Sequence, residues 1–233
     1  MDTINLLIKF GEKQNIESLQ NGKLYMKNLK YYINREIESG DNTVGDKYDG
    51  MFPINDCDFD FYDSETKKKA FSVNKASAVF DLGYTMCPTF CMFLFDRRNI
   101  TETNLNSIKY EFTEEQKIKL KGFGTHALVI TNTNSFINRV EKGFLNNKMS
   151  VYRNTVKYFK GNELEHLKDI QKDNRKIAFW KRDIYTHQQE YRFFGYDCKV
   201  DDHCEIDIGD LRDISQMVEI DNLFDMYALC NFK

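Results

Sequence analysis

Three polar residues spaced two apart, Gln188, Glu190 and Arg192, have the types and spacing for chemistry on one face of a strand. Alternate side chains of an extended chain point to the same face, so these three would lie together while Gln189 and Tyr191 point to the other face. A carboxylate flanked by an amide and a guanidinium is held ionised and oriented, and it can stabilise positive charge that develops on a sugar. The simpler alternative is a Glu–Arg pair that orders the strand and contributes about 0.2–1 kcal/mol.

Aromatic side chains just upstream could wall a pocket beside this strand. Trp180, Tyr185 and His187 precede it, and such rings stack on a planar ligand. The stretch also holds a competing motif, because Arg182-x4-His187 has the spacing of the Arg and His pair with which HEPN-type ribonucleases cut RNA at a dimer cleft. Those domains are all-helical, whereas runs such as Val129-Ile130 are typical of strands. RNA cleavage is therefore the weaker hypothesis.

The cysteines and histidines form no clear metal motif. Cys87-x3-Cys91 and Cys198-x5-Cys204 lack the CxxC pairs of structural zinc sites, and His203 is one candidate ligand without a set of partners. We expect no metal.

The other histidines and the glycine pairs also give no motif for catalysis or phosphate binding. His126 and His166 are expected to be structural or solvated. Gly122-Phe123-Gly124 is followed by neither a third glycine nor a Lys-Ser/Thr pair, which disfavours nucleotide-dependent phosphoryl transfer.

The elements that must position the candidate residues follow from periodicity and turn signals. The predicted strands are residues 5–10, 23–26, 78–80, 89–95, 126–130, 151–152, 190–194 and 204–208. The predicted helices are residues 12–20, 113–120 with a capping box, 135–144 capped by Ser135, and 162–172. Residues 34–63 are acidic and turn-rich and are predicted to form a surface loop. This order of elements predicts an α+β fold rather than a doubly wound sheet.

Composition predicts one domain and no membrane segment. The chain has 233 residues, two prolines and no Gly/Ser- or Pro-rich linker, and no run of 18 apolar residues occurs. The N-terminal apolar stretch lacks the pattern of a signal peptide, so we expect a cytoplasmic protein whose six cysteines are free thiols. A net charge of −3 disfavours bulk attraction to a phosphate backbone, and the Lys67-Lys68-Lys69 run is expected in a solvated loop.

Several short segments together carry a resemblance to known proteins. They are Ile8-Lys9-Phe10-Gly11, Gly22-Lys23-Leu24-Tyr25-Met26, Gly45-Asp46-Lys47-Tyr48-Asp49-Gly50, Val151-Tyr152, and Lys181 leading to Gln188-x-Glu190-Tyr191-Arg192. This set resembles a broad family of bacterial and phage proteins of unknown function, some of them near abortive-infection genes. The skeleton is also similar to the ADP-ribosyltransferase fold, whose split sheet begins with an Arg- or His-bearing strand and ends with a Gln/Glu-x-Glu strand.

The resemblance implies a single domain with a mixed, split sheet, peripheral helices and NAD as cofactor. Glu190 would hold the nicotinamide ribose, Gln188 would orient the acceptor, and Tyr25 and Tyr185 would pack the nicotinamide. Lys9 would contact the cofactor where that fold usually has Arg or His, and no Ser-Thr-Ser follows. This departure implies either a different cofactor pose or a scaffold kept for binding alone.

Two hypotheses of different classes follow. The first is an ADP-ribosyltransferase-like protein that acts in phage–bacterium conflict and modifies a host or phage protein or a nucleic acid. The second is a non-enzymatic inhibitor or adaptor that binds a host immune complex, in which the acidic segment from Asp41 to Asp60 could imitate nucleic acid.

Overall fold

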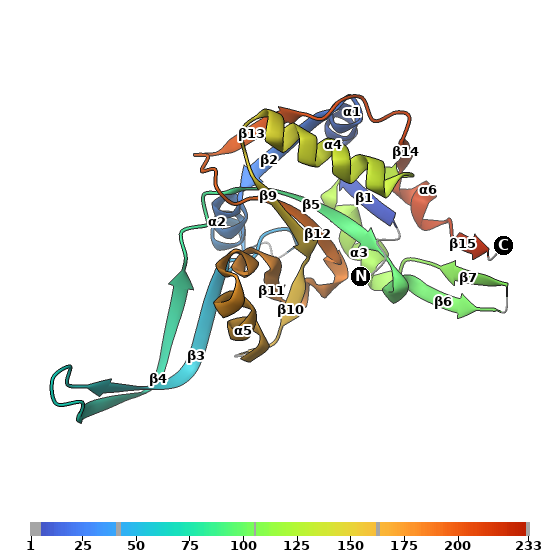
Figure 1. The fold of residues 1–233 in the computed structure, drawn as a ribbon. Helices are drawn as coiled ribbons and strands as arrows, with labels where there is room; N and C mark the ends of the chain where they lie inside the picture. The colour runs from blue at the N-terminus through green and yellow to red at the C-terminus, as the bar shows by residue number, and fades with distance from the viewer. Residues whose placement is uncertain (1–5, 41–42, 105, 162–163, 232–233) are drawn as a thin grey trace.

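An eight-stranded antiparallel sheet forms the centre of the molecule, and helices pack on its faces (Figure 1). The computed structural model describes residues 6–40, 43–104, 106–161 and 164–231. The central strands are β1 (Leu6–Gly11), β2 (Lys23–Asn28), β5 (Pro88–Phe95), β8 (His126–Ile130), β9 (Val151–Thr155), β12 (Glu190–Gly195), β13 (His203–Asp207) and β14 (Ser215–Glu219). The helices are α1 (Lys13–Gln20), α2 (Leu29–Ser39), α3 (Glu114–Leu120), α4 (Thr133–Asn146), α5 (Leu164–Lys172) and α6 (Ile220–Phe224), with 3-10 turns η1 (Arg97–Asn99), η2 (Lys121–Phe123), η3 (Asn174–Phe179) and η4 (Asp183–Gln188).

Three small sheets extend from this centre. They are the hairpin of β3 (Met51–Tyr62) and β4 (Lys69–Asp81), the set β6 (Ile100–Thr103), β7 (Ser107–Tyr110) and β15 (Ala228–Asn231), and the pair β10 (Lys157–Phe159) and β11 (Trp180–Arg182). Within the described ranges only β10 and β11 pair in parallel, so the mixed character of the sheets comes from this pair. The structure thus confirms a single α+β fold.

The central sheet divides along one edge of β5. Phe93 pairs with both Ile8 of β1 and Glu190 of β12, while Thr89 pairs with both Lys27 of β2 and a residue of β12. Since β12 occupies one edge of β5, β1 and β2 must share the other edge, at opposite ends of the strand. Residues 90–92 of β5 have no strand partner on this second edge. The sheet is split there.

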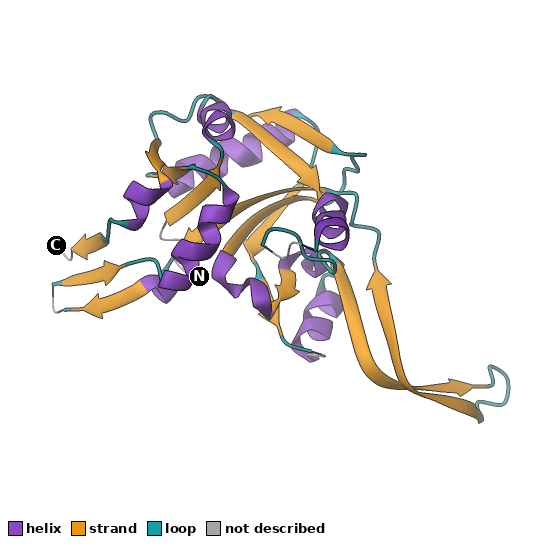
Figure 2. Cartoon of the chain, turned by 180° about the vertical axis from the view of Figure 1, so that it is seen from behind, coloured by secondary structure: helices purple, strands orange, loops and turns teal. Residues whose placement is uncertain are grey.

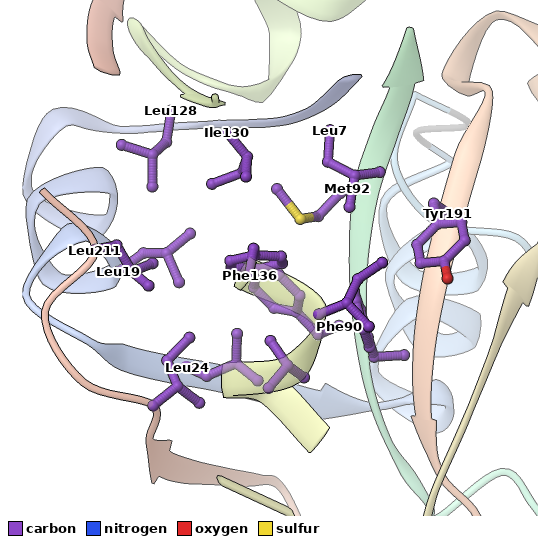
Figure 3. Close-up of a cluster of buried hydrophobic side chains, with 14 of the residues drawn as sticks. Leu7, Leu19, Leu24, Phe90, Met92, Leu128, Ile130, Phe136, Tyr191 and Leu211 are labelled. Atoms are coloured by element: carbon purple, nitrogen blue, oxygen red, sulfur yellow. The ribbon is translucent and has the colours of Figure 1, made fainter. Parts of the chain in front are cut away.

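Alternation along β5 fills both faces of the sheet. Phe90 and Met92 point to one face, where α4 contributes Phe136 to a large apolar cluster (Figure 3). Phe93 and Phe95 point to the opposite face, into a second cluster with residues of β1, α3 and α6. β5 is therefore the buried central strand that its continuous apolar run predicts.

The β3–β4 hairpin leaves the body as a long arm, which both views show (Figures 1 and 2). Residues 34–63 were predicted to form a loop, and this prediction is wrong for most of the segment. The segment contains the end of α2 and all of β3, because Asn28 caps α2 by accepting from Tyr31 N at 2.9 Å and Gly40 ends it with a left-handed φ of 66°. β4 is also longer than the predicted strand 78–80.

Other predicted elements hold with shifted ends. The helix predicted from residue 135 begins at Thr133 and is capped by Asn132, whose Oδ1 accepts from Ser135 N, so Ser135 is not the cap. The capping box at Thr113 is confirmed. Residue 5 and residues 162–163, where a strand and a helix were predicted to start, lie outside the described residues. No helix of the described chain is long and apolar enough to span a membrane.

Candidate functional site

An inner cavity of about 110 Å³ lies where the sheet splits. Its lining residues come from β1, β5, β11, β12 and η4, from α2 and the segment before β3, and from α3 and η2. Its polar lining comes from Lys9, Tyr32, Asp49, Cys91, Lys181, Gln188, Glu190 and Arg192, and its apolar lining from Ile8, Phe10, Val44, Met92, Phe93, Leu120 and Phe123. The predicted catalytic residues Gln188, Glu190 and Arg192 therefore do line one cavity.

The backbone brings these three residues together by a different route from the one predicted. Glu190 and Arg192 share a face of β12, but Gln188 ends the 3-10 turn η4 and Gln189 has a left-handed φ of 39°. The prediction of an extended chain from Gln188 is therefore wrong. The side chain of Gln189 is buried and donates to Leu94 O and Asn99 Oδ1, both at 2.8 Å, which stabilises the turn. Gln188 enters the cavity from η4 rather than from the strand.

A buried ion cluster lines the cavity. Glu190 Oε1 accepts from Lys181 Nζ at 2.5 Å, and its Oε2 accepts from Arg192 Nη2 at 2.8 Å. Asp49 receives both terminal nitrogens of Arg192, at 2.7 and 3.1 Å. Lys181 also donates to Gln188 Oε1 at 2.8 Å. Two carboxylates thus pair with two cations, while Arg192 Nε is buried without a hydrogen-bond partner among the described residues.

Burial and charge act in opposite directions on these groups. Burial alone would raise the pKa of Glu190, but Lys181 and Arg192 outweigh burial and bring this pKa well below its usual value. Burial raises the pKa of Asp49 despite the same two cations. Glu190 is therefore the carboxylate that is firmly ionised at neutral pH.

Lys9 bridges the split in the sheet. Its Nζ donates at 2.7 Å to the carbonyl oxygen of Cys91, a β5 residue without a strand partner on that edge, and it lies 4.7 Å from the centre of the Phe90 ring. Burial lowers the pKa of Lys9 and raises the pKa of the Cys91 thiol to about 11. Cys91 is consequently a neutral thiol rather than a nucleophile.

A larger vestibule of about 450 Å³ adjoins the inner cavity. The two spaces share the lining residues Lys9, Phe10, Tyr32, Val44 and Phe123. Tyr25 of β2 lines only the vestibule; it is 44% exposed and its ring stacks on His203 at 4.9 Å. Lys9, Tyr25 and Glu190 therefore lie along one continuous depression, with Tyr25 near its mouth.

Tyr185 lies apart from both spaces. It is fully buried, and its hydroxyl contacts Arg182 Nη2 and Glu36 Oε2, each at 3.2 Å. Tyr185 lines neither the inner cavity nor the vestibule. Its position therefore does not support the prediction that it packs against nicotinamide. The centre of its ring lies 4.9 Å from Lys181 Nζ, which is a cation–π contact.

The Arg182–His187 pair of the ribonuclease hypothesis also lines neither space. Arg182 is bonded to Glu36 and to Asp46 Oδ1, the latter at 2.8 Å. Since the fold is α+β, the all-helical resemblance also fails at the level of architecture.

The acidic segment from Asp41 to Asp60 is not a continuous exposed surface. Asp46 and Asp49 are buried and bonded to Arg182 and Arg192, which removes them from any imitation of nucleic acid. Residues 41–42 lie outside the described residues. The predicted surface loop leaves Asp49 out of the site, because its partner Arg192 lies 143 positions later and no local pattern shows the pairing.

Among the described residues no three His, Cys, Asp or Glu side chains are grouped to hold a metal ion. His203 pairs instead with Asp202 through its Nδ1 at 2.7 Å.

No protein-family model, no curated protein and no solved structure was found to match this chain.

Proposed function

We propose that this protein is an ADP-ribosyltransferase-like enzyme that binds NAD in the inner cavity and its vestibule. The observation that supports this most is the position of Lys9, Tyr25 and Glu190 along one depression at the split of the sheet. They come from β1, β2 and β12, three strands far apart in the chain. The acceptor of the transferred group would be a protein or a nucleic acid.

The size and lining of the two spaces fit the parts of a dinucleotide. The inner cavity of about 110 Å³ suits one small ring rather than a whole dinucleotide, and Phe10 and Phe93 offer apolar surface to it. The vestibule of about 450 Å³ has room for the rest, and Lys23 and Arg35 line it with positive charge for a diphosphate. Lys27 also lines it, but its Nζ is paired with Asp202 at 2.6 Å. Lys23 is only weakly held, since its Nζ lies 3.8 Å from Glu205 in an exposed pair.

Glu190 is the residue that would act on the reacting bond. NAD supplies a glycosidic bond between the ribose and nicotinamide, and positive charge develops on the ribose as that bond breaks. An ionised Glu190 at the edge of the cavity would stabilise this charge, with Lys181 and Arg192 holding the carboxylate in place. Gln188, held by Lys181 and by Thr43 O, would orient the acceptor.

The test is NAD titration by calorimetry together with nicotinamide release, for the unaltered protein and for Glu190→Gln. Glu165→Gln on α5 makes the same change at an exposed position and is the matched control. We expect NAD binding by all three proteins and at least a hundredfold slower release in Glu190→Gln alone. Absence of binding heat in the unaltered protein, or equal release from all three, would contradict the proposal.

Among the described residues, Glu190→Gln leaves Lys181 and Arg192 with Asp49 as their only carboxylate partner, so the melting temperature of this variant must be measured first. Tyr25→Ala provides a variant whose folding is not at issue, because this side chain is 44% exposed. NAD affinity unchanged in Tyr25→Ala would count against the vestibule as part of the binding site.

A second candidate function is binding without catalysis. The observation in its favour is that both carboxylate oxygens of Glu190 are already bonded to cations, as in a purely structural ion cluster. In that case NAD would give no heat, and a stoichiometric host partner would be retained equally by the unaltered protein and Glu190→Gln in a pull-down.

A further inference from the structure

The outer edge of β4 is open along its whole length. β4 spans 13 residues, from Lys69 to Asp81, and within the described part of the chain it pairs only with β3. Its apolar side chains are exposed, including Phe71 at 56% and Val79 at 50%. A two-stranded hairpin is marginal in water by itself, and a long apolar edge is a template for another strand.

The charges along the arm favour one kind of strand at this edge. β4 begins with Lys69 and ends with Asp81, with Lys75 at its centre, so it is basic at one end and acidic at the other. A strand of this pattern complements itself when two copies run antiparallel, because each basic end then meets an acidic end. The edge of β3 lacks this property, since its outer half is acidic and two copies would repel.

We propose that β4 pairs antiparallel with β4 of a second copy of this chain, about a twofold axis at Lys75. In this register Lys69 lies opposite Asp81 of the second copy, and Phe71 lies opposite Val79 of the second copy. The symmetry gives each of these contacts twice. The left-handed φ of 55° at Lys75 lies where the β3–β4 register shifts, which marks a bulge. The two Lys75 residues meet at the axis and repel each other, so the attraction comes from the charged ends and the apolar pairs on either side.

The shape of the molecule permits this arrangement. The arm projects clear of the body in both views, so antiparallel arms place the two bodies at opposite ends of a four-stranded ribbon (Figures 1 and 2). The stacked pair Phe61 and Phe71, with ring centres 4.6 Å apart, would then lie on a surface of four strands instead of two. A four-stranded ribbon is stable where a lone hairpin is marginal.

Sedimentation equilibrium over a range of protein concentrations measures the dimer Kd. The proposal is tested by comparing this Kd among variants in which the charges at the two ends of β4 are reversed. The unaltered protein is expected to form a dimer, and Lys69→Asp to raise the dimer Kd by roughly tenfold or more, because two Asp–Asp contacts replace two ion pairs. The double variant Lys69→Asp with Asp81→Lys reverses both charges and is expected to restore Kd to within about threefold. Lys67→Asp makes the same charge change outside the paired strand and is the control; its Kd should stay unchanged.

The double variant separates the proposed contact from an effect within one chain. Lys69 also forms an ion pair with Asp60 of its own arm at 2.6 Å, and both variants lose this bridge. Recovery in the double variant can therefore come only from the contact with Asp81 of the second copy. A monomer at every concentration, no recovery in the double variant, or an equal loss in Lys67→Asp would each overturn the proposal.

Discussion

The imidazole of His166 gives this protein a pH-dependent stability whose size follows from its surroundings. The ring is fully buried, stacks on Trp180 at 4.6 Å and meets the ring of Phe52 edge-on at 4.4 Å. Neither ring nitrogen has a hydrogen-bond partner among the described residues. Burial lowers the pKa of His166 from 6.5 to about 4, with only a small opposing effect from Asp169.

The sign follows from where the proton binds. Below pH 6.5 the unfolded chain takes up a proton that the folded chain refuses, so this stability is complete above pH 6.5 and is lost as the pH falls toward 4. At about 1.36 kcal/mol per pKa unit, the loss is limited to roughly 3.4 kcal/mol and reaches about 2.5 kcal/mol at pH 4.5. We expect the free energy of unfolding of His166→Phe to fall less than that of the unaltered protein, by this amount, between pH 7.5 and 4.5.

Urea denaturation at several pH values measures this difference. Buried carboxylates such as Glu190 also lose stability in acid, but they do so equally in both proteins and cancel in the comparison. His203→Phe is the control, because His203 is exposed and its substitution keeps a ring beside Tyr25. If His166→Phe and the unaltered protein lose stability in parallel, the reasoning about the buried imidazole is refuted.

Three further predictions concern the site. Asp49→Asn should lower the free energy of unfolding, measured by urea denaturation, by about 3 kcal/mol, because it leaves Arg192 with one buried carboxylate partner. A decrease below about 1 kcal/mol would contradict a stabilising role of the ion cluster. Cys91 should react with iodoacetamide at pH 7.5 roughly a hundredfold more slowly than an ordinary thiol, because its pKa is raised to about 11. Mass spectrometry measures the rate of alkylation, with the exposed Cys230 as internal reference. Tyr25→Ala should weaken NAD binding about fivefold in calorimetry, as expected for about 1 kcal/mol of lost stacking.

The sequence could predict the strand that carries the candidate site but not how the chain enters it. The apolar alternation of residues 190–194 reflects packing on both faces of β12, and this local pattern is visible without a structure. The left-handed turn at Gln189 is held by Leu94 and Asn99, which are about ninety residues distant. Such contacts leave no trace in the local pattern, which therefore predicts Gln188 on the strand.

The loop predicted for residues 34–63 is wrong for a related reason. Asn28 and Gly40 are recognisable as the two ends of α2, but the polar residues between them concealed its narrow apolar stripe of Leu29 and Ile33. An acid in a turn-rich stretch is usually exposed, so the predicted surface loop puts Asp49 in solvent with its neighbours. Only its pairing with Arg192, 143 positions later, shows that the carboxylate is buried.

The split in the sheet explains why the first strand carries Lys9, where the resemblance implies an Arg or a His. β1 and β2 can share one edge of β5 only if the backbone groups left open between them find other partners. The flexible stem and compact ammonium of a lysine reach the Cys91 carbonyl from β1, and the same ammonium remains at the wall of the cavity. An arginine fork would present a planar group to a single carbonyl oxygen, and an imidazole would be too short to cross the split. Lysine at this position is therefore tied to the way this sheet divides, and a ligand in the cavity would meet a cation already committed to the backbone.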